Sequence, residues 1–114
     1  MEQINSKQDL INYFEKGCKK ENQLSIGVEH EKFIFDNLTN QRANFEAISK
    51  VFNFLEQFGW KPIKEKDCVI GLSREGQSIT LEPGNQIELS GKKLNSVHLN
   101  CSESYKYLDE LRKA

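Results

Sequence analysis

The stretch ITLEPGNQIELSG, residues 79–91, carries the clearest structural signal in the chain. Its central Pro-Gly-Asn favours a tight turn, because proline fixes one backbone angle and glycine accepts a positive φ. On both sides of the turn, aliphatic and polar residues alternate, which is typical of strands that bury one face. The stretch therefore predicts two short strands, with Glu82 and Glu88 on the faces opposite the aliphatic side chains.

A second stretch, IGVEHEKFIFD at residues 26–36, shows a related pattern. The alternation over residues 24–35 predicts a strand, with aliphatic residues on one face and two acids on the other. His30 lies between the acids in sequence, so we expect it to point to the aliphatic face and to pack there. If these strands are neighbours, four carboxylates line a single surface of the sheet: Glu29, Glu31, Glu82 and Glu88.

The remaining periodicity predicts helices before, between and after these strands in the sequence. Ser6 and Asp9 have the spacing of a capping box, and Gly59 suits the end of a second helix. The predicted helices cover 6–17, 44–58 and 96–111, and the predicted strands cover 24–35, 69–72, 78–82 and 86–90. The last helix has an apolar stripe formed by Val97, Cys101, Tyr105, Leu108 and Leu111. This order predicts an α+β fold, an antiparallel sheet with flanking helices.

Composition narrows the class of protein. The 114 residues are 37% hydrophobic and 29% charged, with a formal net charge of -1. A nearly neutral chain without a basic stripe gives little support to nucleic-acid binding, and the apolar runs are too short to span a membrane. The first residues resemble neither a signal nor a transit peptide, so a cytoplasmic location is expected. The three cysteines, Cys18, Cys68 and Cys101, are expected to be buried apolar residues rather than nucleophiles.

Four carboxylates on one surface repel one another. Two like charges about 4 Å apart cost about 1 kcal/mol in water and several times more where water is scarce. The cluster can face bulk solvent, take up protons, pair with basic residues or bind a divalent cation. Acids on the wet face of an antiparallel sheet are ordinary. A magnesium site is the rival interpretation, because Mg²⁺ prefers carboxylate oxygens and shares them with substrate phosphates.

The two acidic stretches also resemble a known family. IGVEHEKF and ITLEPGNQIELSG are similar to the two N-terminal signatures of glutamate–cysteine ligase of the plant and proteobacterial type. FGWKPI and VIGL lie between them in the order found in that family, and the resemblance covers residues 24–98. Asn85 departs from the pattern, since the family usually has a second glycine there. Asparagine tolerates left-handed backbone conformations, so the turn is expected to form.

The resemblance implies a partial glutamine-synthetase-like fold, with the active site on a cupped antiparallel sheet. It implies an ATP-dependent ligase that forms γ-glutamylcysteine from glutamate and cysteine, the first step of glutathione biosynthesis, with Mg²⁺ and ATP at the site. Phosphoryl transfer of this kind relies on positioning and on charge neutralisation by the metal. The resemblance assigns no catalytic residue here. It places Glu29, Glu31, Glu82 and Glu88 at metal-ligand positions and Gln86 in the nucleotide pocket, and we expect Glu29, Glu82 and Glu88 to converge on one or two Mg²⁺ ions.

Ligases of this family are far longer than 114 residues, so residues 1–114 are expected to form a single N-terminal segment of a larger catalytic domain. The missing C-terminal part would be its partner, and the chain alone would be inactive. Two alternatives remain open: a related glutamate–amine ligase, and a non-catalytic fragment that binds only metal or a partner. The segment alone is also expected to leave a strand edge unpaired and to uncover Ile79, Leu81, Ile87 and Leu89.

Overall fold

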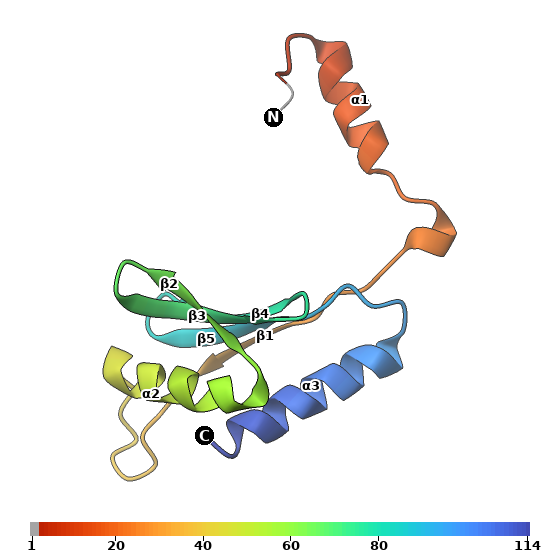
Figure 1. The fold of residues 1–114 in the computed structure, drawn as a ribbon. Coiled ribbons are helices and arrows are strands. Elements are labelled where there is room, and N and C mark those ends of the chain that lie inside the picture. Colours follow the sequence, from red (N-terminus) through yellow and green to blue (C-terminus); the bar gives the residue numbers. More distant parts are fainter. Residues whose placement is uncertain (1–2) are drawn as a thin grey trace.

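The computed structural model describes residues 3–114, and over this range the fold is α+β with a five-stranded antiparallel sheet (Figure 1). This confirms the predicted fold class. The helices are α1 (Lys7–Gly17), α2 (Phe45–Leu55) and α3 (Val97–Leu111), with 3₁₀ turns at Glu21–Gln23 and Glu56–Phe58. The strands are β1 (Glu29–Phe33), β2 (Lys61–Glu65), β3 (Cys68–Arg74), β4 (Gln77–Glu82) and β5 (Gln86–Ser90).

The strand order in the sheet is β1-β5-β4-β3-β2, and every neighbouring pair is antiparallel. Strands β2 to β5 form a meander, whereas β1 reaches the sheet from the other end of the sequence and pairs with β5. Helices α2 and α3 both lie on one side of the sheet (Figure 1). The other side is left without a covering helix by the described residues.

All three hairpins of the meander turn through left-handed residues. Between β2 and β3, Lys66 has φ 53°. Between β4 and β5, Gly84 has φ 73° and Asn85 has φ 58°. Between β3 and β4, Glu75 has φ 48° and Gly76 has φ 85°. Asn85 therefore takes the conformation expected of it, and its Nδ2 also donates to the carbonyl oxygen of Ala43 at 3.1 Å. The side chain that replaces the second glycine thus joins the turn to the segment before α2.

Two strands differ from the prediction. β1 is shorter than the predicted strand over 24–35, because only Glu29–Phe33 runs alongside β5. Outside it, Ile26 and Phe35 each form a single bridge. Strand β2 was not predicted, since its sequence KPIKE has little apolar alternation and contains a proline. An edge strand tolerates proline, because one side of its backbone needs no partner.

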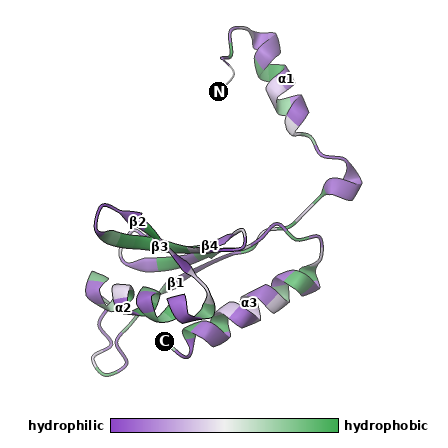
Figure 2. Cartoon of the chain, in the orientation of Figure 1, coloured by the Kyte–Doolittle hydropathy of each residue, from purple (hydrophilic) through white to green (hydrophobic). Residues whose placement is uncertain are grey.

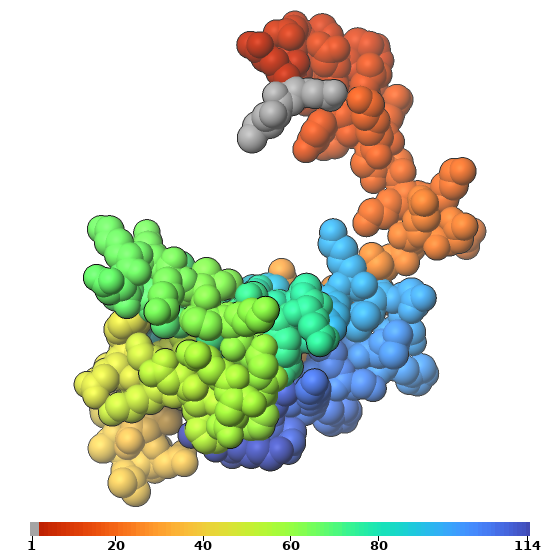
Figure 3. Space-filling model, in the orientation of Figure 1, coloured from red at the N-terminus to blue at the C-terminus, as the bar shows by residue number. Residues whose placement is uncertain are grey.

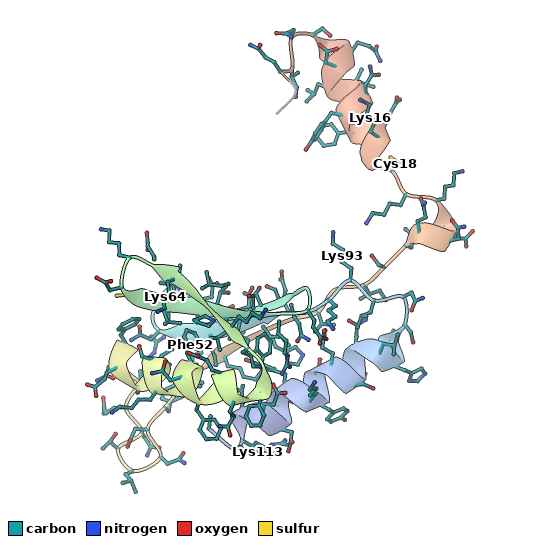
Figure 4. The ribbon with its side chains drawn as sticks, viewed as in Figure 1. Lys16, Cys18, Phe52, Lys64, Lys93 and Lys113 are labelled. Atoms are coloured by element: carbon teal, nitrogen blue, oxygen red, sulfur yellow. The ribbon has the colours of Figure 1, made fainter. Side chains whose placement is uncertain are left out.

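The core lies between the sheet and the two helices. Ile48, Phe52 and Leu55 of α2 are fully buried. Figure 4 shows Phe52 between α2 and the sheet, and Figure 2 shows β3 as the most continuously hydrophobic strand. The expectation that the apolar strand positions are uncovered is wrong, because the helices of the chain itself pack on them. Ile79, Ile87 and Leu89 are fully buried and Leu81 is half-buried.

A buried ion pair fixes the orientation of α3. The Arg74 guanidinium donates to the Glu110 carboxylate at 2.8 Å, and both side chains are less than one tenth exposed. The Trp60 indole N–H donates to the other carboxylate oxygen at 2.9 Å. Arg74 also donates to the Phe58 carbonyl at 2.9 Å and lies over the Trp60 ring. One carboxylate therefore joins α3, β3 and the turn that follows α2.

This network explains why the predicted apolar stripe of α3 is wrong in part. Val97, Cys101 and Tyr105 are exposed, and Leu108 and Leu111 are half-buried. The fully buried positions of the helix are Asn100, Tyr107 and Glu110. Because Glu110 must face Arg74, the helix turns its mixed face, and not its most apolar stripe, towards the sheet. Burial raises the pKa of the Tyr107 hydroxyl on that face.

The cysteines are not buried. Cys18, Cys68 and Cys101 are free and exposed, so the expectation of buried cysteines is wrong. Cys18 lies in the segment after α1, Cys68 begins β3 next to a turn, and Cys101 lies on an exposed part of α3. Each lies where the packing of α2 and α3 on the sheet does not reach. Their sequence neighbours do not reveal this, because it depends on how the elements pack.

Helix α1 stands away from the rest of the molecule (Figure 3). Its start is capped as predicted, since the Ser6 hydroxyl accepts from the Asp9 N–H at 3.1 Å. None of its residues is buried, although Leu10, Ile11 and Phe14 form an apolar face. The Cα radius of gyration is 18.1 Å, compared with about 13 Å for a compact chain of this length.

Replacing Glu110 with alanine should strongly destabilise the fold, because it leaves the Arg74 guanidinium and the Trp60 N–H buried without their acceptor. We expect the free energy of unfolding to fall by about 3–5 kcal/mol in urea titrations followed by circular dichroism. The control is Lys50→Ala, which breaks the exposed pair with Glu46 and should cost at most about 1 kcal/mol. The double variant Arg74→Met/Glu110→Leu should recover much of the loss. Equal losses in Glu110→Ala and the control would refute this role.

Candidate metal-binding site

The predicted acids lie on the side of the sheet opposite α2 and α3. The register pairs Glu31 with Glu88, Glu29 with Ser90, and Glu82 with Gln86. Residues directly opposite one another point to the same side of a sheet, and so do residues two apart along one strand. All four carboxylates therefore belong to one surface, which we call the acidic face: the sheet side that carries Glu29, Glu31, Glu82 and Glu88.

Glu88 is at the centre of the acidic face. Glu31 lies directly opposite it on β1, and Thr80 lies directly opposite on β4. Glu29 and Glu82 occupy diagonal positions relative to Glu88. Direct pairs have Cβ atoms about 4.5–5.5 Å apart and diagonal neighbours are about 7–8 Å apart. The sheet therefore brings Glu31 closest to Glu88, whereas the sequence favoured Glu29, Glu82 and Glu88 as the converging set.

Hydroxyl groups of the same strands hold two of these acids. Thr80 Oγ1 donates to Glu82 Oε1 at 2.9 Å, and Ser90 Oγ donates to Glu88 Oε1 at 3.2 Å. In each case the hydroxyl lies two residues from the acid along the strand. The sequence analysis missed Thr80 and Ser90 as site residues. Their spacing of two residues from an acid is the signal that could have identified them, because it places both groups on one face.

Gln86 lies beside Glu82, as the register requires. Its Nε2 donates to the Pro83 carbonyl at 3.3 Å, so in this structure its amide supports the hairpin turn. Gln86, Glu82 and Glu88 are half-buried, whereas Glu29 and Glu31 are exposed. Among the described residues, no hydrogen bond is formed by the amide oxygen of Gln86, which lies at the edge of the acidic face.

The four carboxylates of the acidic face form no ion pairs within the described chain. Within residues 3–114, no lysine, arginine or histidine forms an ion pair with any of the four carboxylates. The surface lysines with acidic partners are elsewhere, as in Lys50 with Glu46 and Lys113 with Asp109. Ion pairs with basic residues of the described chain therefore do not relieve the repulsion between the four carboxylates.

His30 and Lys32 are on the opposite side of β1, facing α3. His30 is half-buried, as predicted, and its Nδ1 lies 3.3 Å from Lys32 Nζ. The Lys32 ammonium lies 5.4 Å from the centre of the Tyr107 ring, and burial lowers the pKa of this lysine. These basic groups are separated from the acidic face by the sheet, so they do not relieve its charge.

The carboxylates share a face but do not yet form a coordination cage. Among the described residues, no group of three or more His, Cys, Asp or Glu side chains is arranged to hold a metal ion. The convergence of Glu29, Glu82 and Glu88 on Mg²⁺ stays a prediction, and the register meets its requirement that the three acids share one sheet face. The hydrogen bonds from Thr80 and Ser90 hold two of the carboxylates along their own strands.

The donor chemistry of the acidic face suits a hard divalent cation. All the candidate ligands are oxygen atoms, and Mg²⁺ is bound in proteins by one or two carboxylates together with waters and substrate phosphates. The fold and this face together define an α+β domain that presents a carboxylate-rich sheet surface, with its helices packed on the opposite side.

Comparison with known proteins identifies the protein family. Residues 25–114 match the model of glutamate-cysteine ligase family 2. This match covers most of the chain and includes both acidic stretches. The chain belongs to the glutamate-cysteine ligase family 2.

Curated relatives agree with the family. The chloroplastic glutamate–cysteine ligase of Medicago truncatula is 43% identical over 108 residues, which are 94% of this chain and 21% of the relative. The corresponding protein of Arabidopsis thaliana is 40% identical with the same coverage. Chloroplastic glutamate–cysteine ligase A of Oryza sativa subsp. japonica is 42% identical and is covered to 22%. The chain thus spans about a fifth of the length of the curated relatives it matches.

The names of these relatives also overturn one prediction. The cytoplasmic location expected from the sequence is wrong by this comparison, because the matched relatives are chloroplastic proteins. Within residues 3–114, no helix has the length and hydrophobicity needed to cross a membrane.

The repulsion between Glu31 and Glu88 can be measured directly. We expect Glu31→Gln and Glu88→Gln each to raise the free energy of unfolding by less than about 1 kcal/mol at low ionic strength, because like charges directly opposite one another destabilise a sheet. The double variant should gain less than the sum of the two, since both singles remove the same repulsion. Added salt should shrink the gain.

The control for this cycle is Glu65→Gln on β2, an exposed acid away from the acidic face. Its effect should be small and additive with that of Glu88→Gln. A clear loss of stability in Glu88→Gln would instead mean that the carboxylate supports the fold.

Proposed function

We propose that this chain supplies part of the Mg²⁺–ATP site of a ligase that joins the γ-carboxyl of glutamate to the amine of cysteine, the first step of glutathione biosynthesis. The observation that carries the proposal is the acidic face, whose carboxylates come from the two stretches that match the family. Their charge is not balanced by the described residues, and this favours a ligand that brings its own cation. The names of the relatives supply the reaction.

The residues that would hold Mg²⁺ are Glu31 and Glu88, which are directly opposite, with Glu29 and Glu82 on the diagonals. When bound, the metal neutralises phosphate charge and aligns the phosphoryl group for transfer. The protein's own contribution is positional. Thr80 and Ser90 fix two carboxylates by hydrogen bonds, and Gln86 presents an amide next to Glu82 in the proposed nucleotide pocket.

We further propose that residues 1–114 are a single N-terminal segment of a larger ligase catalytic domain with a glutamine-synthetase-like fold. The coverage of about a fifth of each relative supports this proposal. The five antiparallel strands would form part of the cupped sheet, and polypeptide outside this segment would supply the groups that bind glutamate, cysteine and the rest of ATP. The outer edges of β1 and β2, which have no partner strand among the described residues, offer places for such additions.

A chimera tests the proposed function. The 108 residues that align would replace their counterpart in the Medicago truncatula relative, and phosphate release would be measured with ATP, Mg²⁺, glutamate and cysteine. We expect the chimera to be active and Glu88→Gln in the chimera to lose at least about a hundredfold in kcat, because the central ligand of the metal is removed. Thermal unfolding of the variant should not fall, since the change relieves repulsion.

The controls separate folding from function. The relative itself sets the reference activity, and the 114-residue chain alone should show no turnover. Glu65→Gln in the chimera should be as active as the unmodified chimera. A chimera that matches the relative in size-exclusion profile and melting temperature but has no activity would contradict the proposed function.

Metal binding can be tested without activity. Mg²⁺ should raise the melting temperature of the chain, by an amount corresponding to about 1.4 kcal/mol when its concentration is about ten times the Kd. The effect should be reversed by a chelator and should be much smaller in Glu31→Gln and Glu88→Gln, because each removes one of the paired oxygen ligands. An equal rise in the Glu88→Gln variant would show that the metal binds elsewhere.

A further inference from the structure

A polar cleft of about 470 Å³ lies at one end of the acidic face. It is between the segment that leads into β1 and the loop that follows β5. Its lining combines two ammonium groups, two hydroxyls and a carboxylate with the backbone around a glycine: Lys19, Ser25, Glu29, Ser90, Gly91 and Lys93.

The loop after β5 is held firmly by hydrogen bonds. The Gly91 N–H donates to the Val28 carbonyl at 2.8 Å, and Ile26 and Leu94 exchange two backbone hydrogen bonds at 2.7 and 2.9 Å. The Lys92 N–H donates to both carboxylate oxygens of Glu103, at 3.1 and 3.2 Å. A side chain on Gly91 would collide with the Glu103 carboxylate. The cleft wall is therefore a defined part of the fold.

The lysines of this region differ in their partners. Lys92 forms an ion pair with Glu75 at 2.9 Å, which neutralises its charge. Over the part of the chain that the structure describes, Lys19 and Lys93 form no ion pair. Figure 4 shows Lys93 extending from the loop after β5 on the side away from α3. Two uncompensated ammonium groups thus border a cleft that ends at Glu29.

This arrangement selects for one kind of ligand. A simple anion would be attracted by Lys19 and Lys93 but repelled by Glu29, and a free cation would meet the opposite pattern. A phosphate chain that carries a divalent cation satisfies both, because its oxygens can accept from the lysines while its cation faces the carboxylate. Backbone and hydroxyl groups around Gly91 and Ser25 leave room for the chain.

We propose that this cleft binds the phosphate chain of a nucleoside triphosphate, with Lys93 and Lys19 on the phosphates and Glu29 towards the bound cation. This inference rests on the proposed function and adds the orientation of the nucleotide along the acidic face. The phosphates lie at the end of the acidic face formed by Glu29 and Ser90, and the sheet from there to Glu82 is left for the group that receives the phosphoryl transfer.

The first test uses inorganic triphosphate and the 114-residue chain, with binding measured by calorimetry. We expect Lys93→Gln to weaken binding about tenfold, because it removes a charge-assisted hydrogen bond, and Lys93→Arg to retain most of it. The matched control is Lys64→Gln on β2, an exposed lysine at the opposite edge of the sheet, which should bind as the unmodified chain does. Circular dichroism checks that each variant is folded.

Binding with and without Mg²⁺ distinguishes the role of Glu29 from that of the lysines. Glu29→Gln should weaken triphosphate binding in the presence of Mg²⁺ but not in its absence, since without the cation this carboxylate only repels phosphate. No detectable binding by the unmodified chain, or equal affinities for Lys93→Gln and Lys64→Gln, would overturn the proposal.

The second test distinguishes this inference from the proposed function. In the chimera, Lys93→Gln should raise the KM for ATP about tenfold and leave the KM for glutamate unchanged. A raised KM for glutamate alone would mean that the cleft binds a carboxylate substrate, and the inference would fail. An inactive chimera together with Lys93-dependent triphosphate binding would reject the ligase reaction while keeping the phosphate site.

Discussion

The carboxylate of Glu110, shared between Arg74 and Trp60, is the interaction on which the rest of the structure depends. It joins the last helix to the middle of the sheet and to the turn after α2. A buried pair of this kind is costly to form and more costly to break, so it contributes more to selecting one arrangement than to stability. It holds α3 on the side of the sheet opposite the acids, where α2 also packs.

The parts of the fold that follow from local pattern could be predicted from the sequence. Alternation of residues placed Glu82 and Glu88 on the same face, and the turn residues located the hairpin that joins their strands. The buried face of α3 could not be predicted, because it is decided by Arg74 on β3, which is distant in sequence. Strand β2 was missed for a related reason: it is ordered by pairing with β3 at the sheet edge and not by its own composition.

The candidate site could also be predicted only in part from the sequence. Sequence identified which carboxylates share a face, because that depends only on the two-residue period of a strand. It did not identify which of them are closest, because the pairing of Glu31 with Glu88 depends on the register between β1 and β5. Nor did it indicate that Thr80 and Ser90 hold two of the acids along their strands. Family resemblance supplied the interpretation as ligands, and the geometry shows how the set is laid out.

The position of β1 in the sheet has a consequence for how the site is assembled as the protein folds. Strands β2 to β5 are joined by short turns, so their contacts are local and can form early. β1 can pair with β5 only after a long loop has closed. Loop closure costs conformational entropy before the pairing of the strands compensates for it. Glu29 and Glu31 therefore arrive last. Until they do, half of the carboxylates of the acidic face are absent, so the proposed cation site would be complete only at the final step of folding.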